Sequence, residues 1–269
     1  MSHLTFVGLG LYNERSISLR GLDLAKEADY VFAEFYTSLM PGLDMENLEK
    51  LIGKSILVLK RADVEEHAES KILDAIKGKK AVFLVPGDPM IATTHIDLRL
   101  RAEKTGIKTN VIPGASIFSA ICAVTGLQAY KFGRTVTLPH IKSNSPPGSP
   151  YDHIGANLEN GLHTLILLDI MAEKGYYMAI KEGLEYLQQI ELNRKQNIVH
   201  NNRLVIGVAR AGGDDAVAKT GTVSELLKYD FGRPPHCLVV PSQLHFMEAE
   251  ALRILTGAEP EALKSCIST

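Results

Sequence analysis

The chain has 269 residues, of which 45% are hydrophobic and 22% charged, a composition typical of a folded globular protein longer than one usual domain. Its formal net charge is −2, which gives no reason to expect direct binding to nucleic acid. No apolar run approaches the ~18 residues of a membrane helix, and the N-terminus lacks a signal-peptide pattern, so we expect a cytoplasmic protein without membrane contact. Three scattered cysteines lack metal-ligand spacing, so we expect thiols and no metal site.

Strand and helix signals alternate through the first half of the chain. Apolar runs typical of strands are "HLTFVGL", "YVFAEF", "SILVLK", "AVFLVP" and "IKTNVIP". Segments with helical spacing lie between them: "SLRGLDLAKEA", "DMENLEKLIG" with Asp44 as cap and Gly53 as stop, "EEHAESKILDAIKG", and "IDLRLRAEKTG". This alternation predicts βαβ units and a mostly parallel sheet.

The second half starts afresh near Gly133. We predict strands in "GRTVTLP", "HTLILLDI", "RLVIGVARAGG" and "HCLVVPS", a loop in "SNSPPGSP", and helices over 172–193 and in "MEAEALRILTG". The expected fold is therefore two α/β domains with mostly parallel or mixed sheets, an N-terminal domain over 1–131 and a C-terminal domain over 132–269.

A glycine turn follows the first strand in "FVGLGLYNERS". Gly8 and Gly10 resemble the opening of a dinucleotide-binding G-x-G-x-x-G, but Asn13 stands at the third position and the next helix begins late. A pyrophosphate needs a helix N-terminus directly at the turn. A nicotinamide-dependent oxidoreductase, with Glu34 on a ribose hydroxyl, stays open, as does a purely structural tight turn.

An acid between two prolines ends the strand in "AVFLVPGDPMIATTH". Pro86 and Pro89 stiffen the loop and remove two backbone donors, while Asp88 presents an anion where open α/β sheets bind ligands. Such a loop suits a cationic or hydroxyl-bearing ligand better than a polyphosphate. Asp88 could instead cap a helix beginning near Ile91 or form an Asx-turn.

A second glycine turn, "PGAS" over 113–116, follows another strand, and two such loops on one sheet edge favour a ligand crevice. S-adenosylmethionine fits these requirements. It carries a sulfonium, an ammonium and ribose hydroxyls but no phosphate.

Further motifs carry a resemblance to a known family. They include "VFAEFYTS", "GDPMIATTH", "GLQAYKFG", "GLHTLILLDI" and "DFGRPPHCLVVPSQLHFMEAE". Through nearly its whole length the chain resembles the diphthine synthase family, within the tetrapyrrole-methylase-like class of S-adenosylmethionine-dependent methyltransferases. "VFAEFYTS", "GDPMIATTH" and "DFGRPPH" are specific to this branch, whereas the glycine turn and Pro-Gly-Asp-Pro mark only the wider class.

The resemblance implies a homodimer with S-adenosylmethionine bound in a cleft between the domains and S-adenosylhomocysteine as product. Carried onto matching positions, the cofactor contacts are Leu11, Asp88, Ile91, Ser116, Ile117, Leu168, Ala211 and His236. The implied substrate is translation elongation factor 2, on which a histidine already carries an aminocarboxypropyl group. Repeated N-methylation of that amine, to the trimethyl stage, gives diphthine.

Methyl transfer from a sulfonium to an amine is an in-line displacement, so we expect positioning rather than a metal or a covalent intermediate to supply the catalysis. We assign no catalytic base; His95 is expected to start a helix with its ring bonded to backbone. Three alternatives stay open: a methyltransferase acting on a corrin precursor, a non-catalytic partner of the elongation factor, and the oxidoreductase. The mixed charge of "HIKSNSPPGSPYDHI" favours a protein substrate over a polycarboxylate macrocycle.

Overall fold

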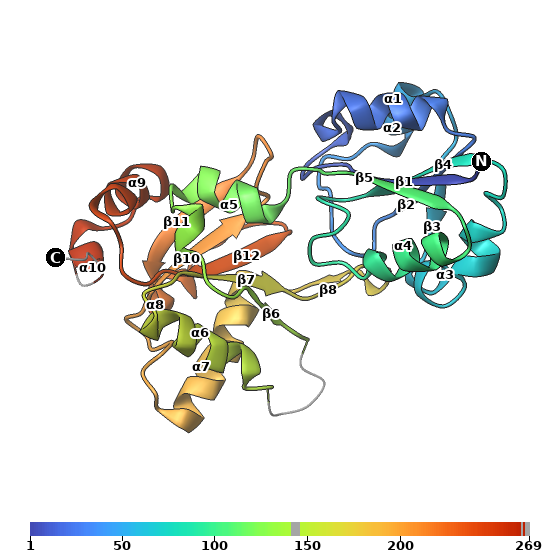
Figure 1. The fold of residues 1–269 in the computed structure, drawn as a ribbon. Helices are drawn as coiled ribbons and strands as arrows, with labels where there is room; N and C mark the ends of the chain where they lie inside the picture. The colour runs from blue at the N-terminus through green and yellow to red at the C-terminus, as the bar shows by residue number, and fades with distance from the viewer. Residues whose placement is uncertain (141–145, 265, 267–269) are drawn as a thin grey trace. The chain divides into compact units, whose positions relative to one another are not determined.

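The computed structural model describes residues 1–140, 146–264 and 266 (Figure 1). By its packing the chain divides into two compact units: unit 1 is Met1–Ile117 with Ala172–Lys174, and unit 2 is Phe118–Met171 with Gly175–Thr269. The expected boundary after residue 131 lies later than this division, which places most of α5 (Ile117–Thr125) in unit 2. The physical reason is contact: the turn at Gly126 packs directly against Ala251 of α9 (Phe246–Thr256).

Unit 1 contains one parallel sheet of five strands in the order β3-β2-β4-β1-β5. The strands are β1 (His3–Gly8), β2 (Tyr30–Glu34), β3 (Leu57–Leu59), β4 (Lys80–Val85) and β5 (Lys108–Ile112). Four strands lie within predicted apolar runs and β4 begins one residue before its run, so the prediction of a parallel α/β sheet is confirmed. Because all strands point the same way, the loops that follow them share one edge of the sheet.

Helices cover both faces of this sheet (Figure 1). They are α1 (Leu19–Glu27), α2 (Met45–Ile52), α3 (Arg61–Glu65), a π-helical segment (Glu69–Leu73) and α4 (His95–Lys104), with a 3₁₀ turn (Glu14–Ser16) before α1. Leu22 and Leu48 pack in the core on one face, and Ile72 and Leu98 pack in the core on the other. The predicted helix over residues 65–78 is confirmed only in part, because Glu65 ends α3 and the regular structure that follows, Glu69–Leu73, is π-helical.

The predicted ends of α2 are confirmed. The carboxylate of Asp44 accepts a hydrogen bond from the backbone N–H of Asn47 at 3.1 Å, and Gly53 ends the helix with φ +76°. A side chain with an acceptor oxygen and a residue tolerant of positive φ are the expected chemistry of these two positions.

Unit 2 contains a mixed sheet of five strands in the order β11-β10-β12-β7-β6. The strands are β6 (Val136–Leu138), β7 (Thr164–Leu168), β10 (Leu204–Ala209), β11 (Val217–Thr222) and β12 (His236–Val240). Only β6 and β7 pair in parallel, and the other pairs are antiparallel. Strand β11 was not predicted, because "VAKTGT" lies at the sheet edge and carries one buried pair in a polar sequence.

Besides most of α5, the helices of unit 2 are α6 (Ser149–Glu159), α7 (Ile180–Arg194), α8 (Val223–Leu226), α9 and α10 (Pro260–Lys264), with a 3₁₀ turn at Ala129–Lys131. Tyr151, Ile154, Leu184 and Leu187 bury the inner faces of α6 and α7 in one core. The helix predicted from residue 172 is wrong in its start. A hairpin of β8 (Ile170–Met171) and β9 (Tyr176–Tyr177), joined through a 3₁₀ turn (Ala172–Lys174), occupies that segment. The predicted loop "SNSPPGSP" lies partly outside the described residues.

Candidate functional site

Three residues expected at the site lie at one edge of the unit 2 sheet. Leu168 ends β7, Ala211 follows β10, and His236 begins β12. The antiparallel register pairs Ala209 with His236 and Leu167 with Cys237, so these strand ends are neighbours. The structure thus brings Leu168, Ala211 and His236 together, although they are far apart in sequence.

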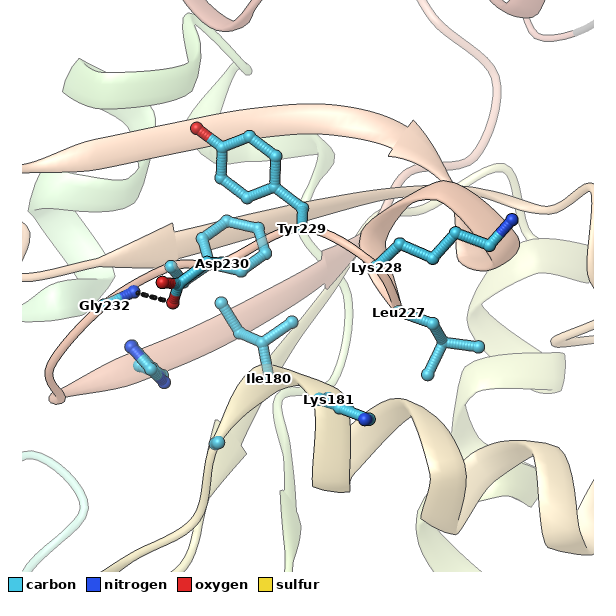
Figure 2. A pocket seen from close by; sticks show the side chains of 10 residues that line it. Ile180, Lys181, Leu227, Lys228, Tyr229, Asp230 and Gly232 are labelled. Atoms are coloured by element: carbon cyan, nitrogen blue, oxygen red, sulfur yellow. Dashed lines mark hydrogen bonds between the residues drawn. The ribbon is translucent and has the colours of Figure 1, made fainter.

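A cavity of about 290 Å³ is lined by residues that include Ile180, Asp230 and Gly232 (Figure 2). His236 also lines this cavity. Its walls are the start of α7, the segment from Leu227 to Gly232, and His236 itself. Apolar side chains such as Ile180 share this lining with the ammonium of Lys181 and the carboxylate of Asp230. The Asp230 carboxylate accepts a hydrogen bond from the backbone N–H of Gly232 at 2.8 Å, which closes the segment into a turn.

In the part of the chain that the structure describes, neither buried ring nitrogen of His236 has a well-formed hydrogen bond, and the nearby acceptors are the backbone carbonyls of Gly232 and Arg233. Burial, and next the positive charge of Arg210, lower the pKa of His236 below its usual range. The ring is therefore neutral at neutral pH, with one nitrogen as donor and the other as acceptor. Buried polar atoms without a well-formed hydrogen bond are rare in folded proteins, so this ring is suited to a polar ligand.

In unit 1, four glycines bring the loops after β1, β4 and β5 into backbone contact. A β-carbon on Gly8 would lie 2.5 Å from the backbone N of Gly114 and 2.5 Å from the carbonyl O of Gly87. Gly10 and Gly87 exchange two backbone hydrogen bonds, of 3.2 and 2.7 Å. Only glycine permits so close an approach of three chain segments.

Asp88 ties two of these loops together. Its Oδ1 accepts from the backbone N–H of Met90 at 2.9 Å, and its Oδ2 accepts from the backbone N–H of Gly114 at 3.2 Å. The first contact is the Asx-turn considered from the sequence. The capping alternative is wrong, because α4 begins at His95 and residues 91–94 form bends.

The other expected residues of unit 1 lie on the same loops. Leu11 follows the Gly10 bridge and is half-buried, Ser116 is buried, and Ile117 opens α5. Ile91 has an exposed fraction of 38% in the bend after Pro89. The backbone contacts of the glycines hold these loops at one sheet edge, which is the arrangement that the motifs predicted.

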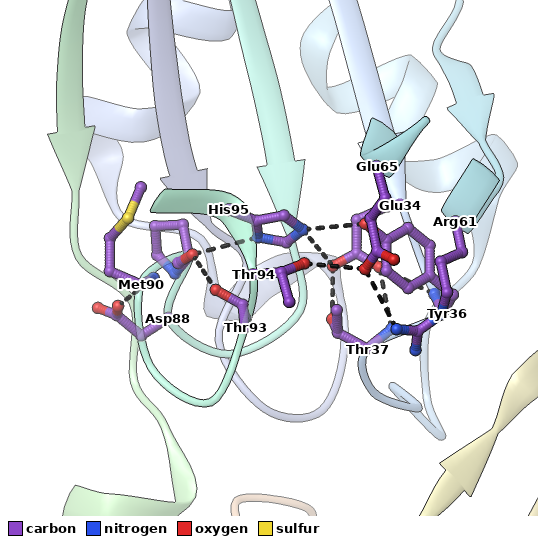
Figure 3. Close-up of polar contacts among 11 residues, drawn as sticks. Glu34, Tyr36, Thr37, Arg61, Glu65, Asp88, Met90, Thr93, Thr94 and His95 are labelled. Carbon is purple, nitrogen blue, oxygen red and sulfur yellow. Dashed lines mark hydrogen bonds and ion pairs between the residues drawn. The ribbon is translucent and has the colours of Figure 1, made fainter. Parts of the chain in front are cut away.

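A polar cluster, which we define as Glu34, Tyr36, Thr37 and His95, lies beside the loop that carries Asp88 (Figure 3). Thr37 is half-buried and the other three residues are buried. The carboxylate of Glu34 accepts from the backbone N–H groups of Tyr36 and Thr37, at 2.8 and 3.0 Å, and from the Thr37 hydroxyl. Burial raises the pKa of Glu34, and the hydrogen bonds from Thr37 and Tyr36 offset part of that effect. Glu34 is fully buried and bonded within the protein, which argues against the open alternative in which it contacts a ribose hydroxyl.

His95 joins this cluster to the loop. Its Nδ1 lies 3.2 Å from the carbonyl O of Pro89, and its Nε2 lies 3.3 Å from the Tyr36 hydroxyl. A carbonyl only accepts, so Nδ1 carries the proton and Nε2 accepts from Tyr36. Burial lowers the pKa of His95 to about 4, so the ring is neutral and makes no ion pair with Glu34, whose Oε1 is 3.7 Å away. The expectation that this ring bonds backbone at the start of a helix is confirmed.

We expect His95→Asn to fold and to change the pH dependence of stability. The asparagine amide can replace Nδ1–H as donor to Pro89. In the wild type, the unfolded state takes up a proton near pH 6.5 that the folded state refuses until about pH 4, so stability falls as pH falls through this window. As the pH falls from 6.5 to 4, the difference in unfolding free energy between wild type and variant should therefore shrink, by at most about 1.4 kcal/mol per pH unit. Urea unfolding from pH 7 to 4 measures it, and a constant difference would contradict the assignment.

Among the residues that the structure describes, no group of three or more His, Cys, Asp or Glu is placed to hold a metal ion. Asp215 lies in an exposed turn and pairs with Arg210 and Arg233, at 2.9 and 3.1 Å. Within the same described part of the chain, no helix is long and apolar enough to cross a membrane.

The sequence analysis did not identify Arg210, which pairs with Asp215 near Ala211 and His236. No local sequence pattern indicates its distant partners.

Comparison with known proteins supports the same family as the motifs. The family model of tetrapyrrole (corrin/porphyrin) methylases matches residues 3–227. The chain is 49% identical over 254 residues to a diphthine synthase of Methanocella arvoryzae, with 94% of this chain and 98% of that protein covered. It is 45% identical over 261 residues to a diphthine synthase of Methanosphaera stadtmanae, with 97% and 98% covered. A solved structure of a diphthine synthase superposes with a TM-score of 0.89 at 39% identity, covering 99% of this chain and 100% of that one.

Proposed function

Because the chain belongs to the diphthine synthase family of tetrapyrrole methylases and is a methyltransferase of diphthamide biosynthesis, we propose that it uses S-adenosylmethionine to trimethylate an amine on translation elongation factor 2. The amine is that of the aminocarboxypropyl group on the modified histidine. The observation that carries this proposal is identity of 45–49% to diphthine synthases over nearly the full length of both chains. We further propose that the enzyme is a cytoplasmic homodimer.

The backbone donors of unit 1 favour a cofactor without phosphate. Pro86 and Pro89 have no N–H groups. The N–H groups of Gly10 and Gly87 bond each other's carbonyl oxygens, and that of Gly114 bonds Asp88. A pyrophosphate binds to free backbone N–H groups at such a turn, and here these groups are already used. The use of these N–H groups within the protein supports S-adenosylmethionine over a nicotinamide dinucleotide as the cofactor.

Two groups of residues would contact the cofactor. The loops of unit 1 offer Leu11, Asp88, Ile91, Ser116 and Ile117, and the sheet edge of unit 2 offers Leu168, Ala211 and His236. The neutral ring of His236 supports this role, because it can both donate to and accept from a nitrogen heterocycle.

The bound cofactor would supply an activated methyl group on its sulfonium. The protein's part is then to orient the acceptor amine in line with the sulfur–methyl bond and to exclude water, which can supply roughly 7–11 kcal/mol of the barrier. The amine must be neutral to react, and a desolvated setting lowers an amine's pKa. Stiff loops held by glycine contacts and by Asp88 suit this task.

Asp88→Ala is expected to weaken S-adenosylhomocysteine binding at least about tenfold, because the Met90 and Gly114 loops lose their common acceptor. Leaving those partly buried N–H groups unpaired should also cost about 1–3 kcal/mol of stability. Calorimetric titration and urea unfolding measure the two effects. Asp97→Ala, which removes an exposed partner of Arg101, is the matched control and should bind normally. Wild-type affinity in folded Asp88→Ala would remove Asp88 from the site.

The function itself is tested with methyl-labelled S-adenosylmethionine and three acceptors: aminocarboxypropyl-modified elongation factor 2, the unmodified factor, and a corrin precursor. Label on the modified factor alone is the expected result. Label on the tetrapyrrole would favour the corrin-precursor alternative, and label on none would favour a non-catalytic partner.

A further inference from the structure

Arg210 is a buried cation at the sheet edge that carries Ala211 and His236. Its exposed fraction is 6%, and its backbone has φ +51°, a left-handed conformation that residues other than glycine seldom adopt. Burial of a guanidinium and a strained backbone are each unfavourable unless surrounding contacts stabilise them. Because the buried charge and the strained backbone occur at the same residue beside the cavity, we expect Arg210 to have a function there.

The contacts of Arg210 converge on the segment before His236. Its backbone N–H donates to the carbonyl of Pro235 at 2.9 Å, and its Nη1 donates to the carbonyls of Phe231, at 2.8 Å, and Arg233. On the other side, Nε donates to the backbone carbonyl of Asp215 at 3.1 Å and lies 2.9 Å from its carboxylate.

This segment forms part of the cavity wall. Phe231 and Gly232 line the cavity, and the chain then runs through Pro235 to the ring of His236. Three carbonyl oxygens along the segment, those of residues 231, 233 and 235, bond to Arg210. These contacts of Arg210 therefore fix the wall relative to Ala211, the next residue, in addition to the ladder that pairs Ala209 with His236.

We propose that Arg210 is a positioning residue that holds the Phe231–Pro235 segment and the His236 ring in their cofactor-binding arrangement. This role rests on the proposed use of S-adenosylmethionine. A planar guanidinium can serve acceptors on opposite sides at fixed angles, whereas a lysine ammonium is a single point with rotatable donors. Lysine at this position should therefore keep the charge but lose part of the geometry.

The electrostatic setting of His236 gives a readout that a purely structural role would not move. The charged residues that line its cavity are Asp230, Lys181 and Lys228, and the charge of Arg210 acts on the ring from outside this lining. Removing the Arg210 charge should raise the pKa of His236 toward its ordinary value while burial continues to lower it. The C2 proton of His236, identified by its absence in His236→Asn, reports this titration in the ligand-free protein.

The experiment compares Arg210→Met, Arg210→Lys and Arg253→Gln in the full chain. Arg253 lies on α9 of the same unit, and its side chain is 49% exposed and pairs with Glu250, so it is a matched control. We expect Arg210→Met to bind S-adenosylhomocysteine about 100-fold more weakly and to titrate His236 at higher pH. Arg210→Lys should be intermediate, with the His236 titration nearer to wild type, and Arg253→Gln should stay within about twofold.

Folded Arg210→Met with affinity within twofold of wild type would overturn the proposal. If Arg210→Met does not fold, Arg210→Lys is judged by the same criterion. Absence of S-adenosylhomocysteine binding by the wild type would be a different result, because it contradicts the proposed cofactor before any variant is compared.

Discussion

Gly8→Ala is expected to abolish cofactor binding and to destabilise unit 1 by about 3 kcal/mol or more. The added methyl group would lie 2.5 Å from both the Gly87 carbonyl O and the Gly114 backbone N, closer than a β-carbon approaches non-bonded atoms in real structures. Both neighbours are backbone, so neither can rotate away as a side chain would. Relief requires β1 to move relative to the ends of β4 and β5, and the loops carrying Asp88 then separate.

Gly78→Ala is the matched control for this substitution. Gly78 has φ +75°, but a β-carbon there would meet nothing within 4 Å, so alanine adds backbone strain without a clash. We expect a loss of about 1–2 kcal/mol with normal S-adenosylhomocysteine affinity. Urea unfolding and calorimetric titration of both variants make the comparison. If Gly8→Ala is no more damaging than Gly78→Ala, the three-loop contact is not what shapes the site.

Glu248→Gln is expected to destabilise unit 2 by about 3–5 kcal/mol. Glu248 is fully buried and accepts from His163 Nε2 at 3.1 Å, Lys131 Nζ at 2.6 Å, and the backbone N–H groups of Gln128 and His245, both at 2.9 Å. The amide removes the charge that faces Lys131 and turns one acceptor into a donor. Glu250→Gln is the control on the same helix, because its carboxylate is 51% exposed and pairs only with Arg253 in the described structure.

The pH dependence of this effect has a definite sign. Burial alone would raise the pKa of Glu248, but hydrogen bonds from His163, Gln128, Lys131 and His245 outweigh it and lower the pKa to about 2. A carboxyl group whose pKa is lowered by folding stabilises the protein at pH values above its ordinary pKa of 4.5. This contribution to stability is lost as the pH falls from 4.5 toward 2. The stability difference between wild type and Glu248→Gln should therefore narrow below pH 4.5. A difference independent of pH would contradict the charge as the cause.

The strands and caps of unit 1 could be predicted because their signals are local. A buried parallel strand is a short apolar run, and Asp44 and Gly53 act on residues three or four positions away. Strand β11 and helix α6 were not predicted, because both depend on contacts with segments that are distant in the sequence. Strand β11 is largely polar and is defined by its ladder with β10.

The candidate site divides in the same way. Asp88 and the glycine turns were visible because prolines and glycines mark backbone geometry directly in the sequence. What Asp88 does was not visible, since its partner Gly114 lies on another loop. His95 and Glu34, as well as Arg210 and Phe231, meet only in the folded chain. Sequence spacing therefore identified the loops but not the polar contacts that hold them.

Mass spectrometry of elongation factor 2 tests the central claim most directly. The factor carrying the aminocarboxypropyl histidine is incubated with this enzyme and S-adenosylmethionine, digested, and the histidine peptide is fragmented. The account predicts a mass increase of three methyl groups, located on the amine of the modified histidine and absent when Gly8→Ala replaces the wild type. An unchanged peptide mass with active, cofactor-bound wild-type enzyme would contradict it.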